Sequence, residues 1–191
     1  MNTVQPIRSK SQVMDIAAYL RGKSERDYIL FLFGIYSGLR ISDILPLKVR
    51  DVKGKSRLYM REQKTGKERS ISINKELQKP LADYVSDLEE WEYLFPSRQR
   101  TSRIKKEQET KPLTRQRAIQ ILKAACARFG IENIGTHTLR KTFGYHMYQD
   151  TKDIATIQAI FNHSSPTVTF RYIGIDQDKK DSLVMGFSFK R

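Results

Sequence analysis

The segment His137-Thr-Leu-Arg-Lys-Thr142 places an imidazole and a guanidinium three residues apart, directly after Thr136. Threonine is a common helix cap, so we expect a helix to start here with His137 and Arg140 on one face. Backbone N–H groups without helical partners lie at this end of a helix and favour a phosphate. The His-x-x-Arg spacing is weak by itself, because a structural pair in a basic chain produces the same pattern.

Two further cations lie upstream. Arg40 follows a Gly-Leu pair in Tyr36-Ser-Gly-Leu-Arg-Ile-Ser-Asp43, and Lys64 lies in the turn Gln63-Lys-Thr-Gly-Lys-Glu-Arg69, where Lys67 is its rival. A guanidinium can neutralise the charge on a phosphate under attack, and a turn lysine can protonate a leaving oxygen as a general acid. Taken separately, each is equally well explained as an ordinary surface cation.

A second imidazole and a phenol follow. His163 lies between two expected helices in Phe161-Asn-His-Ser-Ser-Pro166, and Tyr172 follows nine residues later in Thr169-Phe-Arg-Tyr-Ile-Gly174. An isolated tyrosine is usually structural, but Tyr172 lies downstream of both histidine motifs on a short helix. Cations, imidazoles and one phenol together are the inventory for attacking a phosphodiester without a metal ion.

The chain is strongly basic. Its 191 residues include 35 Lys+Arg against 21 Asp+Glu, which gives a formal net charge of +14. Such a surface favours a polyanionic partner, with nucleic acid as the first choice. A protein that is merely basic is the alternative when charge is considered alone. The length suits one compact domain.

Cysteine usage and hydropathy bear on location. The single cysteine, Cys126, lies in a helical pattern, is expected to be a small buried hydrophobe, and cannot form an intrachain disulfide. The longest apolar run, around Tyr28–Tyr36, is far shorter than the roughly 20 residues of a membrane span, and no leader-like apolar region follows Met1. We expect a cytoplasmic protein without a membrane partner.

Periodicity and turn residues predict an α+β fold, mainly helical, with a small antiparallel sheet inserted. Helices are expected from Ser9 or Ser11 to Gly22, over Glu25–Ser37, Ile41–Leu45, Asn74 to about Glu90, Thr114 to about Phe129, Thr136 to about Tyr148, Lys152 or Asp153 to Phe161, and from Ser165 and Asp176 onward. Three strands are expected over Lys48–Val52, Arg57–Glu62 and Arg69–Ile73. The charged segment Arg98–Lys111 is expected to be a mobile loop.

In this order, the functional side chains resemble the active site of the tyrosine recombinase (phage integrase) family. That family has an arginine after a Gly-Leu pair, a β-turn lysine, His-x-x-Arg, a second histidine and a terminal tyrosine, matched here by Arg40, Lys64, His137, Arg140, His163 and Tyr172. By the same match, Asp43 stands where the family has an acidic residue that supports the arginines. Where the family often has Leu-Gly-His, this chain has Phe161-Asn-His163, which keeps the histidine. The resemblance covers about residues 11–174 and implies the integrase catalytic-domain fold.

The resemblance also implies a mechanism. Tyr172 would attack the scissile phosphate, form a 3′-phosphotyrosine link and release a 5′-hydroxyl. The implied roles of the others are phosphoryl binding by Arg40 and Arg140, protonation of the leaving oxygen by Lys64, proton transfer by His137 and phosphate orientation by His163. No cofactor and no metal is required. The partner is double-stranded DNA, on which a homotetramer would join two sites in integration, excision or inversion, and the protein can be a monomer without DNA.

The expected organisation is an arm or linker over residues 1–10, a catalytic domain over 11–175 and a tail over 176–191. The tail carries many apolar side chains for a solvated end: Leu183, Val184, Met185, Phe187 and Phe189. Relatives pass such a segment to a neighbouring subunit, and folding back onto its own subunit is the alternative. Family members usually carry an N-terminal helical clamp that is not found here. The chain is therefore either an excised catalytic domain or similar to short recombinases such as the fimbrial phase-variation invertases.

Three other functions share some of these features. A type IB topoisomerase would use the same chemistry to relax supercoils as a monomer. A non-catalytic DNA-binding module would explain the charge but leave the ordered set as coincidence. A metal nuclease would need clustered carboxylates or His/Cys ligands, and the one remaining histidine, His146, is expected to face the core or the solvent.

Overall fold

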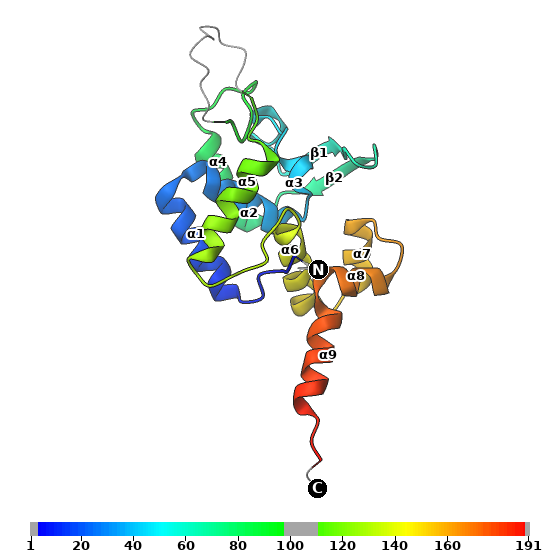
Figure 1. The fold of residues 1–191 in the computed structure, drawn as a ribbon. Coiled ribbons are helices and arrows are strands. Elements are labelled where there is room, and N and C mark those ends of the chain that lie inside the picture. The colour runs from blue at the N-terminus through cyan, green and yellow to red at the C-terminus, as the bar shows by residue number, and fades with distance from the viewer. Residues whose placement is uncertain (1–3, 98–110, 190–191) are drawn as a thin grey trace.

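The computed structural model describes residues 4–97 and 111–189, and most of these are helical (Figure 1). In chain order the elements are α1 (Lys10–Lys23), α2 (Glu25–Ser37), α3 (Ile41–Ile44), the 3₁₀ helix η1 (Val49–Asp51), β1 (Arg57–Arg61), β2 (Glu68–Ser72), α4 (Lys75–Val85), α5 (Arg115–Ala127), α6 (Thr138–Thr151), α7 (Ile154–Phe161), α8 (Pro166–Ile173) and α9 (Ile175–Gly186). The predicted mainly helical fold with a small antiparallel sheet is confirmed. The loop predicted over Arg98–Lys111 lies, except for its last residue, outside the described residues.

Capping side chains set most helix starts, as predicted. The side chains that accept a hydrogen bond from a backbone N–H of the first turn are Ser9, Asn74, Thr114, Asp153 and Ser165. Some predicted boundaries are wrong: α4 ends at Val85 rather than near Glu90, and α6 runs from Thr138, with His137 in the cap position, to Thr151 rather than to about Tyr148. The Thr138 hydroxyl accepts a hydrogen bond from the Gly135 N–H, which closes the turn just before the helix. His137 therefore stands outside the first helical turn.

The sheet has two strands in the described part of the chain, not the three predicted. Strands β1 and β2 pair in antiparallel register, with Leu58 opposite Ile71. The predicted strand Lys48–Val52 is instead the 3₁₀ turn η1, closed by the Asp51 carboxylate, which accepts a 2.7 Å hydrogen bond from the Lys48 N–H. In a 3₁₀ helix, side chains three residues apart eclipse, so the β-branched valines at both ends of the turn are buried together. The valines that predicted a strand therefore belong to a 3₁₀ turn.

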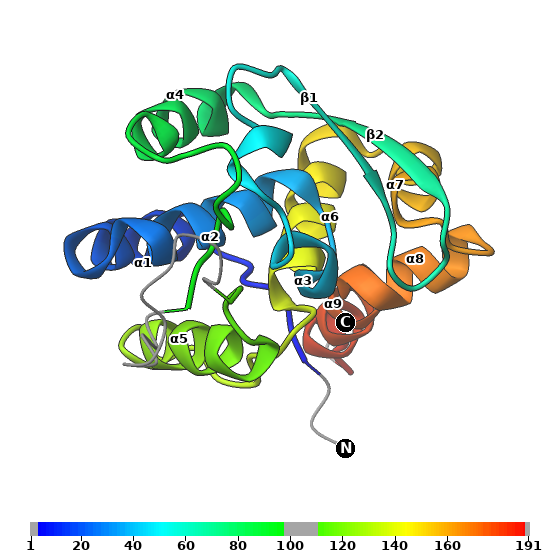
Figure 2. The same cartoon turned by 90° about the horizontal axis from the view of Figure 1, so that it is seen from above.

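Helix α6 joins two hydrophobic cores. Its first half packs on α2, where a Cβ at Gly34 would lie 2.3 Å from the Leu139 side chain. Its second half packs on α7 and α8, where a Cβ at Gly144 would lie 2.7 Å from Phe161 and from Ile173. Leu139 belongs to the larger core, and Phe161 and Ile173 belong to the smaller one. Figure 2 shows the β1–β2 hairpin on the same side of the molecule as α7 and α8.

The N-terminal segment of the described chain packs against α6 and the start of α9. Ile7 is 1% exposed, and its N–H donates to the Thr142 hydroxyl. Arg8 pairs with Asp178 at 2.7 Å. Beyond this contact α9 projects away from the body (Figure 1), and the apolar side chains of the tail are 70–92% exposed. No helix in the described residues has the length and apolar character needed to cross a membrane.

Candidate active site

Arg140 forms the buried floor of the site. It lies in α6, is 2% exposed, and its guanidinium donates to the carbonyls of Gly38 at 2.5 Å and Phe161 at 3.0 Å. The guanidinium also lies 4.2 Å from the centre of the Phe161 ring. Burial lowers the pKa of Arg140 to about 10, partly offset by the Tyr172 phenol, so the group is charged at neutral pH. One arginine thus ties the turn after α2 to the end of α7.

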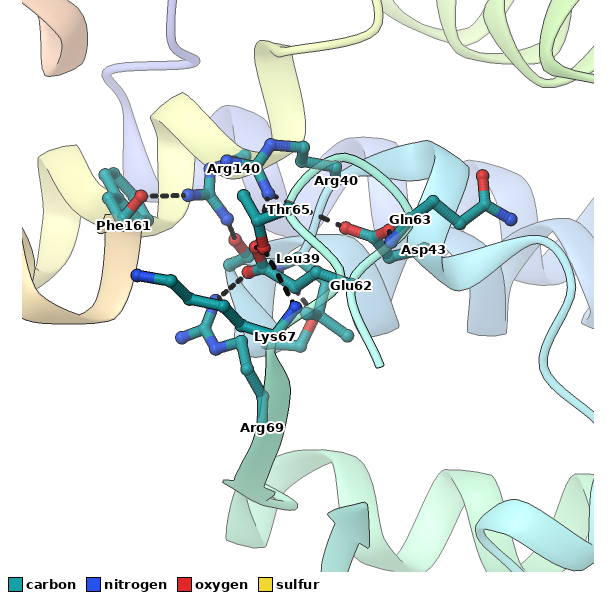
Figure 3. A network of polar contacts seen from close by, with 12 residues as sticks. Leu39, Arg40, Asp43, Glu62, Gln63, Thr65, Lys67, Arg69, Arg140 and Phe161 are labelled. Atoms are coloured by element: carbon teal, nitrogen blue, oxygen red, sulfur yellow. Dashed lines mark hydrogen bonds and ion pairs between the residues drawn. The ribbon is translucent and has the colours of Figure 1, made fainter. Parts of the chain in front are cut away.

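Arg40 lies beside two carboxylates (Figure 3). Its Nη1 atom is 3.0 Å from Glu62 Oε2 and 3.9 Å from Asp43 Oδ2. Asp43 is 1% exposed, and its Oδ1 atom accepts a hydrogen bond from the Gln63 N–H at 3.0 Å. Because Gly38 takes the left-handed conformation, the chain leaves α2 sharply and Arg40 becomes the cap of α3. Its contacts use one guanidinium nitrogen, and a planar guanidinium has further N–H donors for a phosphoryl oxygen.

Tyr172 lies against both imidazoles. His137 Nδ1 is 3.1 Å from the phenol oxygen, and the rings of His163 and Tyr172 lie edge to face with centroids 4.9 Å apart. Burial raises the pKa of the Tyr172 phenol, and the nearby Arg140 and Arg40 partly oppose that shift. The phenol is therefore protonated in the free protein at neutral pH, with an imidazole nitrogen within hydrogen-bond distance.

Both imidazoles are neutral in the free protein. Burial, followed by the charges of Arg140 and other cations, lowers the pKa of His137. Burial and the charges of Arg140 and Arg40 lower the pKa of His163 to about 4. The Thr169 hydroxyl donates to the Ser165 carbonyl, so His163 Nδ1, 3.2 Å from that hydroxyl oxygen, carries the proton that it donates. In the neutral ring, His163 Nε2 is then an acceptor.

The structure brings Arg40, His137, Arg140, His163 and Tyr172 together, but it leaves Lys64 exposed in the turn between β1 and β2. Lys67 of the same turn is also exposed, and Figure 3 shows its side chain extending along the network toward Phe161.

Two residues of the network were missed by the sequence analysis, namely Glu62 and Arg69. The Glu62 carboxylate is 2% exposed and accepts hydrogen bonds from both Arg40 and Arg69, the latter at 2.6 Å. The sequence did carry a signal for Glu62. It follows Leu58 and Met60 at alternate positions, on the face of the strand that points into the protein.

The remaining predictions concern metal ligands and isolated side chains. No three His, Cys, Asp or Glu side chains among residues 4–97 and 111–189 gather as a metal site would require. His146 lies apart from the site, with Nε2 2.9 Å from the Ile7 carbonyl oxygen. Cys126 is buried as predicted, and burial raises its thiol pKa to about 11.

The model of the phage integrase family matches residues 8–179. The chain belongs to this family, whose members are the tyrosine recombinases that cleave and rejoin DNA. It is 54% identical over 178 residues to the probable integrase/recombinase YoeC of Bacillus subtilis (strain 168), covering 93% of each chain.

Solved structures share the fold as well. The crystal structure of XerA recombinase matches with a TM-score of 0.70 at 21% identity, over 90% of this chain and 59% of that one. The XerH site-specific recombinase bound to palindromic difH substrate in a post-cleavage complex matches with a TM-score of 0.69 at 16% identity, over 96% of this chain and 53% of that one. The chain also spans about half the length of other curated tyrosine recombinases that it matches.

Proposed function

We propose that this protein is a site-specific recombinase that cuts and rejoins double-stranded DNA through a 3′-phosphotyrosine bond on Tyr172. The observation that carries the proposal is the 3.1 Å contact between the Tyr172 phenol and His137 Nδ1, beside two arginines. The phenol oxygen attacks the scissile phosphorus as its proton passes to His137, and the bond to the 5′ oxygen breaks. A 5′-hydroxyl from a partner strand later attacks the phosphotyrosine and reverses the step.

Arg40 and Arg140 supply the charge that this reaction needs. The pentavalent transition state carries extra negative charge on its non-bridging oxygens, and a preorganised cation is worth about 3 kcal/mol or more to such a state. Asp43 and Glu62 hold Arg40, while two backbone carbonyls hold Arg140. The phosphodiester energy is kept in the phosphotyrosine bond, so the proposed step uses neither ATP nor a metal ion.

His163 and Lys64 complete the proposed site once DNA is bound. Neutral His163 offers Nε2 as an acceptor, so its proposed hydrogen bond to a phosphoryl oxygen requires the protonated ring. A phosphate anion beside the ring favours that form. Lys64, on the exposed turn, donates a proton to the leaving 5′ oxygen when the hairpin meets the DNA.

Assembly and location follow from the same proposal. XerH was solved on its difH substrate, and a +14 surface suits a DNA partner. We place four subunits on two DNA sites, with DNA exchange occurring in the cytoplasm. The exposed tail, residues 183–189, would dock on a neighbouring subunit in that assembly.

Removing residues from Leu183 onward tests this docking while keeping the anchored start of α9. Recombination should fall at least tenfold, because burying even one apolar side chain contributes about 1.5–3 kcal/mol to docking. Binding to a single DNA site should be unchanged. Replacing only Phe187 and Phe189 by Ser is the matched variant. A drop in melting temperature of the free protein would instead indicate that the tail packs on its own subunit.

The nucleophile is tested with a DNA substrate nicked next to the scissile phosphate, which traps the covalent adduct. Wild-type protein should give a band that survives denaturation, in the presence of excess EDTA as well. Tyr172→Phe should give no adduct while keeping its DNA affinity, because only the attacking oxygen is lost. Tyr59→Phe is the control, since Tyr59 is exposed on β1. An adduct with Tyr172→Phe, or one that strictly needs Mg²⁺, would contradict the proposal.

A further inference from the structure

Glu62 is a buried carboxylate that takes no part in the proposed bond-making and proton-transfer steps. Its Oε1 atom accepts a hydrogen bond from Arg69 at 2.6 Å, and its Oε2 atom accepts from Arg40 at 3.0 Å and from the Thr65 hydroxyl at 2.8 Å. Burial alone would raise the pKa of this carboxyl, but the hydrogen bonds from Arg69, Thr65 and Arg40 outweigh it and lower the pKa to about 2. Glu62 is therefore charged at neutral pH and is shared between two arginines and a turn.

The turn that carries Lys64 is tied to the same carboxylate and to its neighbour Asp43. The Glu62 N–H donates to the Lys67 carbonyl, and the Gly66 N–H donates to the Glu62 carbonyl at 2.8 Å. On one side of Lys64, the Gln63 N–H donates to Asp43. On the other side, Thr65 donates to Glu62. Lys64 is exposed, yet both of its neighbours in sequence are bound to the carboxylates that hold Arg40.

Arg69 extends this arrangement to the smaller core. Its Nη2 atom donates to the Ile160 carbonyl at 2.6 Å, next to the Phe161 carbonyl that Arg140 holds. These two carbonyls end α7, just before the left-handed Asn162 and His163. Figure 3 shows Glu62 at the centre, between Arg40, Thr65 and Arg69. The carboxylate thus connects the hairpin, the phosphate-holding arginine and the segment that presents His163.

We propose that Glu62 is a positioning residue that sets the orientation of Arg40 and the conformation of the Lys64 turn together. This inference rests on the proposed function. When the turn moves to bring Lys64 to DNA, Thr65 changes its contact with the oxygen that Arg40 also uses. Glu62 thereby positions both Arg40, which holds the phosphate, and Lys64, which protonates the leaving oxygen.

Two variants and two substrates separate this role from a merely structural one. Glu62→Gln removes the charge that both arginines use, whereas Thr65→Ala keeps that charge and removes the 2.8 Å contact with the turn, together with a 3.4 Å contact from the Lys67 N–H. One substrate has a normal scissile phosphodiester. The other has sulfur in place of the bridging 5′ oxygen, and because a thiolate leaves without a proton, it makes a positioned lysine unnecessary. The measured quantity is the single-turnover rate of covalent adduct formation with protein in excess.

Glu62→Gln should slow cleavage of the phosphodiester about 100-fold and that of the sulfur substrate about tenfold, because a displaced Arg40 harms both. Thr65→Ala should slow the phosphodiester about tenfold and react with the sulfur substrate at the wild-type rate. DNA affinity should change less than about threefold in either variant, since phosphate contacts over a whole site set affinity. Glu68→Gln is the matched control, because Glu68 lies on the same hairpin and is exposed.

Wild-type rates for Glu62→Gln on both substrates would overturn the inference. A Thr65→Ala variant that cleaves the phosphodiester at the wild-type rate would also overturn it. Because Thr65 is exposed, this variant should fold and can be tested even if Glu62→Gln does not fold. These outcomes leave the proposed function intact, because wild-type protein still forms the adduct. Absence of any adduct with wild-type protein would overturn the proposed function and this inference with it.

Discussion

The site combines two arginines that are fixed by protein contacts with a lysine, the proposed acid, whose side chain is exposed to solvent. Arg140 is 2% exposed and bound to two backbone carbonyls, and Arg40 lies between two carboxylates. Lys64 is exposed on a turn. The difference fits their proposed tasks, because charge stabilisation works best when the groups are in place before the reaction. A proton donor can arrive with the substrate.

The buried side of this comparison should give the largest effect. Arg140→Ala should lower the rate of adduct formation by at least about 10²-fold, the loss of one preorganised stabiliser of about 3 kcal/mol. It should also lower stability, because the carbonyls of Gly38 and Phe161 lose their donor, at about 1–3 kcal/mol for each buried group left unpaired. Single-turnover cleavage and thermal melting measure the two losses.

Arg140→Lys sharpens the result. An ammonium keeps the charge but cannot bridge the two carbonyls with one planar group, so it should not restore either quantity in full. An Arg140→Ala variant with cleavage within a factor of about two of wild type would show that the buried arginine is structural only.

The exposed side should show a loss of rate without a loss of stability. Lys64→Ala should slow phosphodiester cleavage by about 10²-fold, at the low end for a general acid, and leave the melting temperature unchanged. Replacement of the bridging 5′ oxygen by sulfur should restore the rate. Lys67→Ala is the paired variant from the same turn. The general acid is the lysine whose alanine variant regains its cleavage rate on the sulfur substrate. If neither loss is repaired, the proton comes from another group.

The same comparison explains what the sequence could predict. Five residues of the ordered motif lie together in the structure, and local signals precede two of them, Gly38 before Arg40 and the Ser165-Pro166 cap before Tyr172. The family membership and the mainly helical fold are confirmed by the comparisons. The assigned roles of these residues, and the choice of Lys64 over Lys67, stay predictions.

What the sequence could not supply is the set of contacts between distant segments. Arg69 and Ile160 are 91 residues apart, and their hydrogen bond depends on how the hairpin packs beside α7. The third strand was wrongly predicted because β-branched valines are common in strands, whereas their spacing of three fits a 3₁₀ turn. Glu62 differs from these cases, because its alternation with Leu58 and Met60 was visible in the sequence but was outweighed by the expectation that a carboxylate at a strand end belongs to a turn.

The smallest expected effect is a dependence of stability on pH, and it comes from the two imidazoles, which lie between the buried and the exposed side. The pKa of His163 falls from 6.5 to about 4 in the folded protein, and the pKa of His137 also falls. Between these values the unfolded chain binds more protons than the folded one, so the free energy of unfolding decreases as pH falls from 6.5 toward 4. Glu62, with a folded pKa of about 2 against 4.5, adds a further decrease at lower pH.

Chemical denaturation between pH 7 and pH 4.5 should therefore give a lower free energy of unfolding at the acid end, and His163→Gln should reduce that slope. The change is modest, because both rings are partly in solvent. Lys64→Ala is the control and should keep the wild-type slope, since its side chain is in solvent in both states. Bound DNA should reverse the contribution of His163, because a phosphate beside the ring favours its protonated form. A slope that His163→Gln leaves unchanged would show that this imidazole does not titrate on unfolding, and it would remove the basis for treating His163 as neutral in the free protein.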